Sequence, residues 1–180
     1  MWPRSRRRRH GPARADLLVT SLDKAKALAL IVPAALLAGA YGFQHLGGLY
    51  PCEMCWWQRY AHMAGVVFAL LALLLARLPD RARSFVWLAA LAILASGAIG
   101  GYHAGVEAGV FEGFTQCTST ASGGSAEEMM KQILAAPLIR CDQVQWSFLG
   151  ISMAGWNAIL SIGFALVILW LSLRRPRPQA

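Results

Sequence analysis

The sequence predicts an all-α membrane protein in which four transmembrane helices form an up-down-up-down bundle. Hydrophobic residues make up 57% of the 180 residues and charged residues only 14%, against about 25% charged in an ordinary soluble domain. The apolar residues gather in four stretches, each close to the ~20 residues that span a bilayer core. Segments of this length cross lipid as helices, because no water satisfies their backbone groups there. A short turn at 79–83 makes the second and third helices antiparallel neighbours.

The four expected helices divide the chain into a membrane domain and two tails. The apolar stretches cover residues 27–46, 60–78, 84–104 and 152–173. A basic segment, 1–26, precedes them and is expected to be disordered. The membrane domain, 27–173, has two loops on one side, 47–57 and 105–151, and a tail, 174–180, follows it.

The basic residues indicate how the bundle is oriented. The net charge is +8, yet all but three of the 17 Lys and Arg residues lie before the first stretch, between residues 77 and 83 where the second stretch ends and the third begins, or after the last stretch. Cytoplasmic segments carry such an excess, so both termini are expected in the cytoplasm and the loops 47–57 and 105–151 on the outer face of the membrane. This pattern is a topology signal rather than a nucleic-acid surface. A cleaved signal peptide is the competing interpretation of the first stretch, although that stretch is longer than an ordinary signal core.

The longer outer loop is expected to contain a short amphipathic helix. Ser125 followed by Glu128 is a capping-box pattern. One apolar face then follows, made of Met129, Met130, Ile133 and Leu134. Such a helix is expected on the membrane surface rather than across it.

Three glycines recur on one side of the third apolar stretch. Gly97, Gly101 and Gly105 are spaced four residues apart. Small residues at this spacing let another helix approach closely. The sequence therefore predicts a packing stripe there.

All four cysteines lie in the two outer loops rather than in the apolar stretches. Cys52 and Cys55 form a C-x-x-C in the first loop, and Cys117 and Cys141 lie in the second. Three interpretations remain: structural disulfides formed in an oxidising compartment, a metal site, or redox pairs. Zinc sites usually combine two short knuckles and only one pair has that spacing, so no metal is expected.

The residues beside the C-x-x-C favour redox chemistry. Cys55 is expected just before the second helix, whose positive N-terminal end stabilises a thiolate. Arg59, one turn further on, can stabilise that thiolate or donate to an oxygen of a bound ligand, although an arginine there also snorkels to lipid headgroups. Aromatic residues crowd the same boundary, either as an interfacial belt or as the wall of a quinone pocket: Tyr50, Trp56, Trp57 and Tyr60.

Three histidines lie near the ends of the apolar stretches. They are His45, His62 and His103. Haem ligation is disfavoured, because none is paired within its own helix; a polar contact to a ligand or a neighbouring helix is the better interpretation. His103 and Glu107 are one turn apart and could serve proton transfer.

These motifs together resemble the DsbB family of bacterial disulfide-bond formation proteins. The matching residues are the PCEMC segment at 51–55, Arg59, the GYHAGVE segment at 101–107, and Cys141 with the QWSFLGISM segment at 145–153. The resemblance covers residues 27–173. It implies a four-helix enzyme of the bacterial inner membrane.

The resemblance also implies a partner protein and an electron acceptor. Cys117 is then the residue that a reduced, periplasmic, DsbA-like thioredoxin-fold oxidase attacks to form a transient mixed disulfide, and Cys141 is the mate of Cys117. Cys52 and Cys55 are then the pair that passes two electrons to ubiquinone or menaquinone.

The same resemblance assigns the quinone site. Cys55 is implied to lie closest to the quinone ring, with Arg59 and His103 in the binding site. The protein is thus expected to be a quinone-dependent protein-disulfide oxidoreductase.

Two other functions stay open at this point. One is a quinone reductase similar to vitamin K epoxide reductase, in which the C-x-x-C and the loop cysteines normally occur in a different chain order. The other is a membrane scaffold with two structural disulfides, which would resist mild reductant, whereas relay disulfides would exchange readily.

Overall fold

The computed structural model describes residues 20–113, 125–135 and 140–174. Within these residues there are five helices and two short strands. In chain order they are α1 (Ser21–His45), α2 (Glu53–Leu74), α3 (Pro79–Glu107), α4 (Ala126–Ala135), β1 (Ser147–Phe148), β2 (Ile151–Ser152) and α5 (Met153–Leu173). Cys117 and the arginine-rich leader lie outside the described residues.

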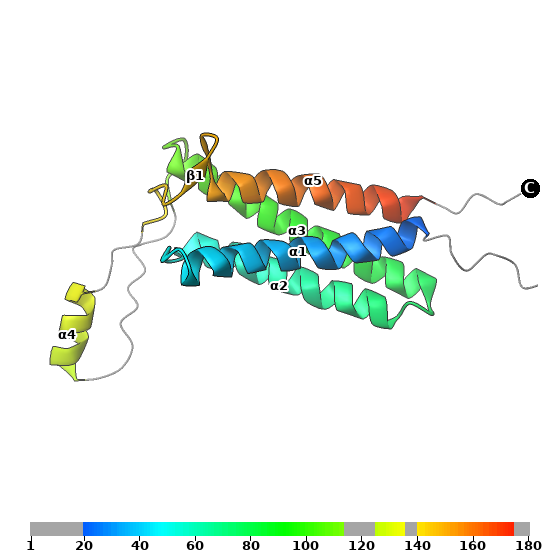
Figure 1. The fold of residues 1–180 in the computed structure, drawn as a ribbon, viewed down its shortest axis with the longest axis horizontal. Coiled ribbons are helices and arrows are strands. Elements are labelled where there is room, and N and C mark those ends of the chain that lie inside the picture. Colours follow the sequence, from blue (N-terminus) through cyan, green and yellow to red (C-terminus); the bar gives the residue numbers. More distant parts are fainter. Residues whose placement is uncertain (1–19, 114–124, 136–139, 175–180) are drawn as a thin grey trace, which may run out of the picture.

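Four of the helices form the expected up-down-up-down bundle. Helices α1, α2, α3 and α5 run alongside one another, and each is long and apolar enough to cross a membrane (Figure 1). Helix α2 packs mainly on α3, α3 on α5, and α1 on both α2 and α5. The Ser21 hydroxyl donates to the carbonyl of Arg174 at 3.3 Å, which places the start of α1 and the end of α5 at the same end of the bundle.

Helices α1, α2 and α3 begin before the apolar stretches that predict them. Helix α1 begins at Ser21, because Thr20 and Asp23 form a reciprocal capping box. Helix α3 begins at Pro79, which suits a first helical turn because proline has no N–H to leave unpaired there. Pro79 was expected within the turn, so that boundary was wrong. Hydropathy marks the part of a helix inside lipid, whereas caps mark its ends.

The close contact between α3 and α5 uses one glycine of the expected stripe, Gly97, together with Gly100. A Cβ on Gly97 would lie 2.8 Å from Ile162 Cγ1, and one on Gly100 would lie 3.0 Å from the carbonyl oxygen of Ala154. Gly101 is exposed and Gly105 instead faces the ring of Phe111. The predicted packing stripe is therefore confirmed at Gly97 and wrong at Gly101 and Gly105, because a helix turn of 3.6 residues moves a row of spacing four around the helix.

We expect the Gly100→Ala substitution to destabilise the bundle by about 1–3 kcal/mol, because the added methyl group overpacks a backbone contact. The new Cβ would lie 3.0 Å from both the Ala154 oxygen and Asn157 Nδ2. Gly101→Ala is the matched control, since its nearest neighbour would be Ala158 Cβ at 3.9 Å. Thermal unfolding in detergent measures both variants. Equal melting temperatures for the two would contradict the assignment of the contact.

A tight hairpin precedes α5 at the end of the bundle opposite Ser21 and Arg174. Strand β1 pairs antiparallel with β2, and Ser147 faces Ser152 across the pair. Leu149 and Gly150 between them both have positive φ, 53° and 76°, as a two-residue type I′ turn requires. The carbonyl of Phe148 accepts a hydrogen bond from Trp156 Nε1 at 3.0 Å, which ties the hairpin to α5.

The predicted helix in the long outer loop is present as α4. The Glu128 side chain accepts from the backbone N–H of Ser125 at 3.0 Å, and Ser125 Oγ accepts from the backbone N–H of Glu128 at 3.3 Å. The capping box is therefore confirmed. Helix α4 lies apart from the four-helix bundle, beyond its outer end (Figure 1). Its position on a membrane surface stays a prediction.

Candidate functional site

The C-x-x-C forms the first turn of α2 rather than the loop before it. Cys52 is the N-cap residue, and its sulfur accepts from the backbone N–H of Cys55 at 3.3 Å. The expectation that Cys55 precedes the helix was therefore wrong, because the polar first turns of α2 fall outside the apolar stretch. The two sulfurs are 2.8 Å apart with both residues as thiols, and a small movement brings them to the S–S bond length of about 2.05 Å.

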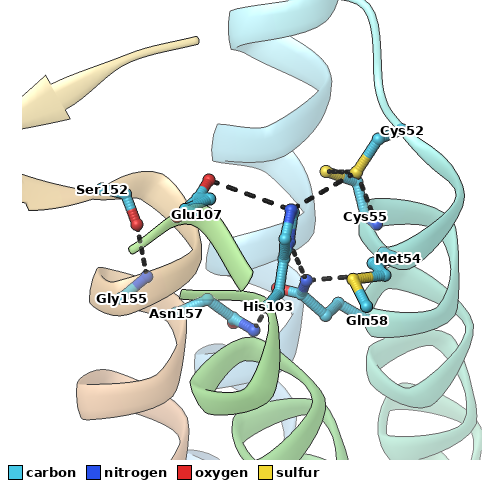
Figure 2. Close-up of polar contacts among 9 residues, drawn as sticks. All are labelled: Cys52, Met54, Cys55, Gln58, His103, Glu107, Ser152, Gly155 and Asn157. Atoms are coloured by element: carbon cyan, nitrogen blue, oxygen red, sulfur yellow. Dashed lines mark hydrogen bonds and ion pairs between the residues drawn. The ribbon is translucent and has the colours of Figure 1, made fainter. Parts of the chain in front are cut away.

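An imidazole from α3 stands beside this dithiol. His103 Nε2 lies 3.6 Å from the sulfur of Cys52 and 3.8 Å from Oε1 of Glu107 (Figure 2). Only 4% of the His103 side chain and 8% of the Glu107 side chain are exposed. Glu107 Oε2 has no hydrogen-bond partner among the described residues. Thiol, imidazole and carboxylate thus form a connected set of groups that can hold and pass protons.

The two thiols and the imidazole also lie close enough together to bind one metal ion. The ligand atoms of Cys52, Cys55 and His103 lie within 4.8 Å of one another. Two thiolates and an imidazole suit a soft ion such as Zn²⁺. The same set is what a redox dithiol beside a proton carrier requires.

Cys141, from the second outer loop, packs on the first cysteine of this pair. Cys52, Met54, Val106 and Cys141 form one buried cluster, with Cys55 against it. Hydrogen bonding with the thiols of Cys141 and Cys55, together with burial, raises the pKa of the Cys52 thiol. The structure therefore brings three of the four predicted cysteines together, with Cys52 in contact with both others.

The raised pKa of Cys52 predicts unequal alkylation of the reduced protein. A higher pKa lowers the thiolate fraction at a given pH, so Cys52 should stay slow to react through pH 7–9, where an ordinary thiol with a pKa of about 8.5 ionises. Cys52 is also 2% exposed, whereas Cys55 is partly exposed. Iodoacetamide labelling followed by peptide mass spectrometry measures both rates, with the denatured chain as control. Equal alkylation rates for Cys52 and Cys55 in the folded protein would contradict the raised pKa of Cys52.

A buried polar network connects this site to α5. Gln58 Nε2 lies 3.1 Å from His103 Nδ1, and Gln58 Oε1 accepts from Asn157 Nδ2 at 2.8 Å (Figure 2). Asn157 Oδ1 lies 2.9 Å from His62 Nε2 and accepts from the hydroxyl of Ser161 at 3.0 Å. Buried polar groups in a membrane bundle are costly and typically mark a functional site.

Sequence reasoning missed most of this network. Gln58 and Asn157 were not singled out, although an amide within an apolar stretch is itself a signal. Asn157 lies near the start of the fourth stretch, and only its packing against α2 and α3 shows which groups it joins. His62, expected to make a polar contact to a ligand or a neighbouring helix, does contact α5 through Asn157.

Arg59 turns into the bundle. It is 6% exposed, and it donates through Nη2 to the carbonyl of Ala40 at 3.1 Å and through Nη1 to Gln44 Oε1. Its guanidinium carbon lies 4.8 Å from the ring centre of Tyr41 and 5.0 Å from that of Trp56. This burial excludes the interpretation that Arg59 snorkels to the headgroups. A guanidinium has five N–H donors, so others remain for a ligand.

A cavity of about 410 Å³ opens beside these side chains, within the ordinary range of about 300–1,000 Å³ for small-molecule sites. Helices α1, α2, α3 and α5 and the hairpin residues all contribute to its wall. The polar lining includes Cys55, Arg59, His62, His103 and Asn157, and apolar side chains such as Leu36 and Leu160 line much of the rest. The walls therefore suit a flat, mostly apolar ligand with a few polar atoms.

A four-helix membrane bundle with a dithiol at one end, a third cysteine in contact with that dithiol, and an adjoining cavity defines a membrane thiol–disulfide oxidoreductase. Its sequence relationships agree: the family model "Disulfide bond formation protein DsbB" matches residues 23–171. The chain belongs to the DsbB family, and its function is in disulfide bond formation.

Several bacterial relatives carry the name Disulfide bond formation protein B. The protein of Marinobacter nauticus is 30% identical over 160 residues, which cover 84% of this chain and 92% of that protein. The protein of an Azoarcus species is 33% identical over 146 residues, which cover 77% of this chain and 84% of that protein. The protein of Paracidovorax citrulli is 32% identical over 166 residues, which cover 85% of this chain and 89% of that protein. No solved structure matches this chain significantly.

Proposed function

We propose that this protein oxidises a periplasmic DsbA-like thioredoxin-fold protein and passes the electrons through two cysteine pairs to a membrane quinone. The observation that carries the proposal is the contact of Cys141 with Cys52, which lines the cavity together with Cys55 and Arg59. A cysteine of the long loop is there within reach of the C-x-x-C at the start of α2, and the C-x-x-C is within reach of a ligand.

The first exchange takes place in the long outer loop. A thiolate of the reduced partner attacks Cys117 of a Cys117–Cys141 disulfide, and Cys141 leaves as a thiolate. The second thiol of the partner then closes the partner's own disulfide and releases Cys117. Two electrons and two protons have moved from the partner to the loop pair.

The second exchange takes place at the N-terminus of α2. The Cys141 thiolate attacks Cys52 of a Cys52–Cys55 disulfide, and Cys55 leaves as a thiolate. Cys117 then attacks Cys141, which restores the loop disulfide and releases Cys52. The order is supported by the packing of Cys141 on Cys52 and by the position of Cys55 at the start of α2, where the helix dipole favours a thiolate.

A membrane quinone would complete the reaction as the acceptor of two electrons and two protons. The residues present fit such a ligand, because the cavity is largely apolar, while Arg59 offers donors and His103 adjoins Cys52. Arg59 would orient a carbonyl oxygen by donating to it. Because Gln58 Nε2 donates to His103 Nδ1, a neutral His103 carries its hydrogen on Nε2, from which it would donate to a Cys52 thiolate and stabilise it. Glu107, whose Oε1 lies 3.8 Å from the same nitrogen, would help to orient the imidazole.

The proposed location follows from the charge pattern. The basic segments at 1–26, 77–83 and 174–177 would face the cytoplasm across the inner membrane. The hairpin and the cysteines would then face the periplasm. Modification by a membrane-impermeant thiol reagent in intact cells tests this orientation.

Quinone reduction by the purified protein in detergent tests the proposed function. A reduced thioredoxin-fold oxidase is the electron donor, and ubiquinone and menaquinone analogues are the acceptors. Each of the four Cys→Ser variants should lose turnover by more than ~10³-fold, because a thiol in the relay has no substitute. Full turnover after replacement of either cysteine pair by serine would show that the proposed relay is wrong. Disulfides that stay intact under mild reductant, without turnover, would identify a structural scaffold instead.

A further inference from the structure

Two backbone carbonyls determine which atoms of the buried network donate. A carbonyl only accepts, so Asn157 Nδ2 must be the atom that faces the carbonyl of Ser96 at 3.2 Å. Gln58 Nε2 likewise faces the carbonyl of Met54 at 3.2 Å. Both side-chain amides are therefore held in one orientation, because a backbone carbonyl can accept a hydrogen bond but cannot donate one. Asn157 presents its oxygen, Oδ1, to His62.

The orientation of Asn157 fixes the protonation of His62. Its Oδ1 can only accept, so His62 Nε2 carries the hydrogen and donates across 2.9 Å. The other ring nitrogen of a neutral imidazole then has a bare lone pair. His62 Nδ1 is buried and has no hydrogen-bond partner among the described residues. His62 is 3% exposed and forms part of the cavity wall.

The polar residues of the cavity wall thus include two groups of opposite kind. Arg59 only donates, and the neutral His62 Nδ1 only accepts. A quinone has carbonyl oxygens and cannot donate to His62, whereas a hydroquinone has two hydroxyl groups that can. An unpartnered acceptor in a low-dielectric wall is costly, so a ligand that satisfies it gains affinity.

We propose that His62 Nδ1 accepts a hydrogen bond from a hydroxyl group of the bound hydroquinone, so that the cavity binds the reduced form of its ligand more tightly than the oxidised form. This inference rests on the proposed function. Tighter binding of the reduced form makes the bound acceptor a stronger oxidant. A tenfold difference between the two dissociation constants raises its two-electron potential by about 30 mV.

Ligand binding to the full chain in detergent tests this proposal without turnover. Cys52 and Cys55 are both replaced by serine, so that neither ligand form is consumed, and quenching of tryptophan fluorescence gives the dissociation constants of a short-chain ubiquinone and its hydroquinone. His62→Gln is the sharp variant, because glutamine keeps a donor for Asn157 and lacks a group at the Nδ1 position. We expect it to weaken hydroquinone binding about fivefold, as for one lost hydrogen bond, and quinone binding less than twofold.

Two controls separate the possible failures. Ser172→Ala removes another buried hydroxyl group of α5, one that accepts from Trp87 Nε1 and does not line the cavity, so it should leave the ratio of the two dissociation constants unchanged. If His62→Gln weakens the binding of quinone and hydroquinone equally, or weakens neither, the proposed role of His62 is wrong. If the cysteine-free site binds neither form while His62 is intact, the proposed quinone function fails with it.

A measurement without any substitution at His62 covers the case in which the variant does not fold. The chain is labelled with ¹⁵N-histidine, and hydroquinone or quinone is added. Hydroquinone should move the resonance of an unprotonated ring nitrogen, because that nitrogen gains a hydrogen bond, and quinone should not. Equal shifts with both forms, or none with either, would overturn the proposal.

Discussion

With only Cys52 and Cys141 remaining of the four cysteines, mild oxidation is expected to join these two in a disulfide. The variant Cys55→Ser/Cys117→Ser leaves two buried sulfurs that already pack together. Disulfide formation needs Cβ atoms about 3.5–4.5 Å apart, and we expect two residues that already pack together to reach that distance with little backbone movement. Non-reducing electrophoresis and peptide mass spectrometry follow the reaction.

The matched control keeps the other cysteine of the C-x-x-C. In Cys52→Ser/Cys117→Ser, the remaining sulfurs are those of Cys55 and Cys141. Serine is a good N-cap residue, so α2 keeps its start. We expect this pair to close at least ~10-fold more slowly, since the thiol of Cys141 is hydrogen-bonded with that of Cys52. Equal rates would contradict the order of exchange proposed above.

The second large effect is expected at Asn157. Asn157→Leu removes hydrogen bonds to the side chains of Gln58 and His62, to the Ser161 hydroxyl and to the Ser96 carbonyl. Hydrogen bonds between transmembrane helices contribute about 0.6 kcal/mol each on average, and a buried group left without a partner costs about 1–3 kcal/mol. We therefore expect a loss of about 2–4 kcal/mol of unfolding free energy.

Unfolding in a detergent or a mixed-micelle denaturant series measures that loss. Ser161→Ala removes one of the contacts and should cost about 1 kcal/mol. Gln58→Leu combined with Asn157→Leu should cost clearly less than the sum of the single losses, because the two share one network. Strict additivity would show that the two amides act separately.

The network also explains why we expect Asn157→Leu to lose more unfolding free energy than Gly100→Ala. A methyl group at Gly100 displaces neighbours by tenths of an ångström, whereas leucine at Asn157 removes hydrogen bonds to polar groups of α2, α3 and α5. In lipid no water replaces them. Both substitutions act at the α3–α5 contact, close to the cavity wall.

The sequence by itself determined the membrane class, the four helices and the position of the C-x-x-C. These depend on local properties: the length of an apolar stretch, the side of the membrane on which arginines lie, and the spacing of cysteines along the chain. The capping box at Ser125 and Glu128 was predictable for the same reason. Helix ends such as Glu53 and Pro79 were not, because helices extend past the lipid-facing stretch.

Only the tertiary structure decided which side chains meet. Whether Arg59 turns inward depends on how α2 is rotated against α1, where Gln44 and Ala40 accept from it. The approach of His103 to Cys52, and the hydrogen bonds that leave one nitrogen of His62 bare, depend on the packing of several helices. Such contacts join residues far apart in sequence, so no local pattern specifies them. The physical reason is that periodicity fixes a helix but leaves its rotation and depth to its neighbours.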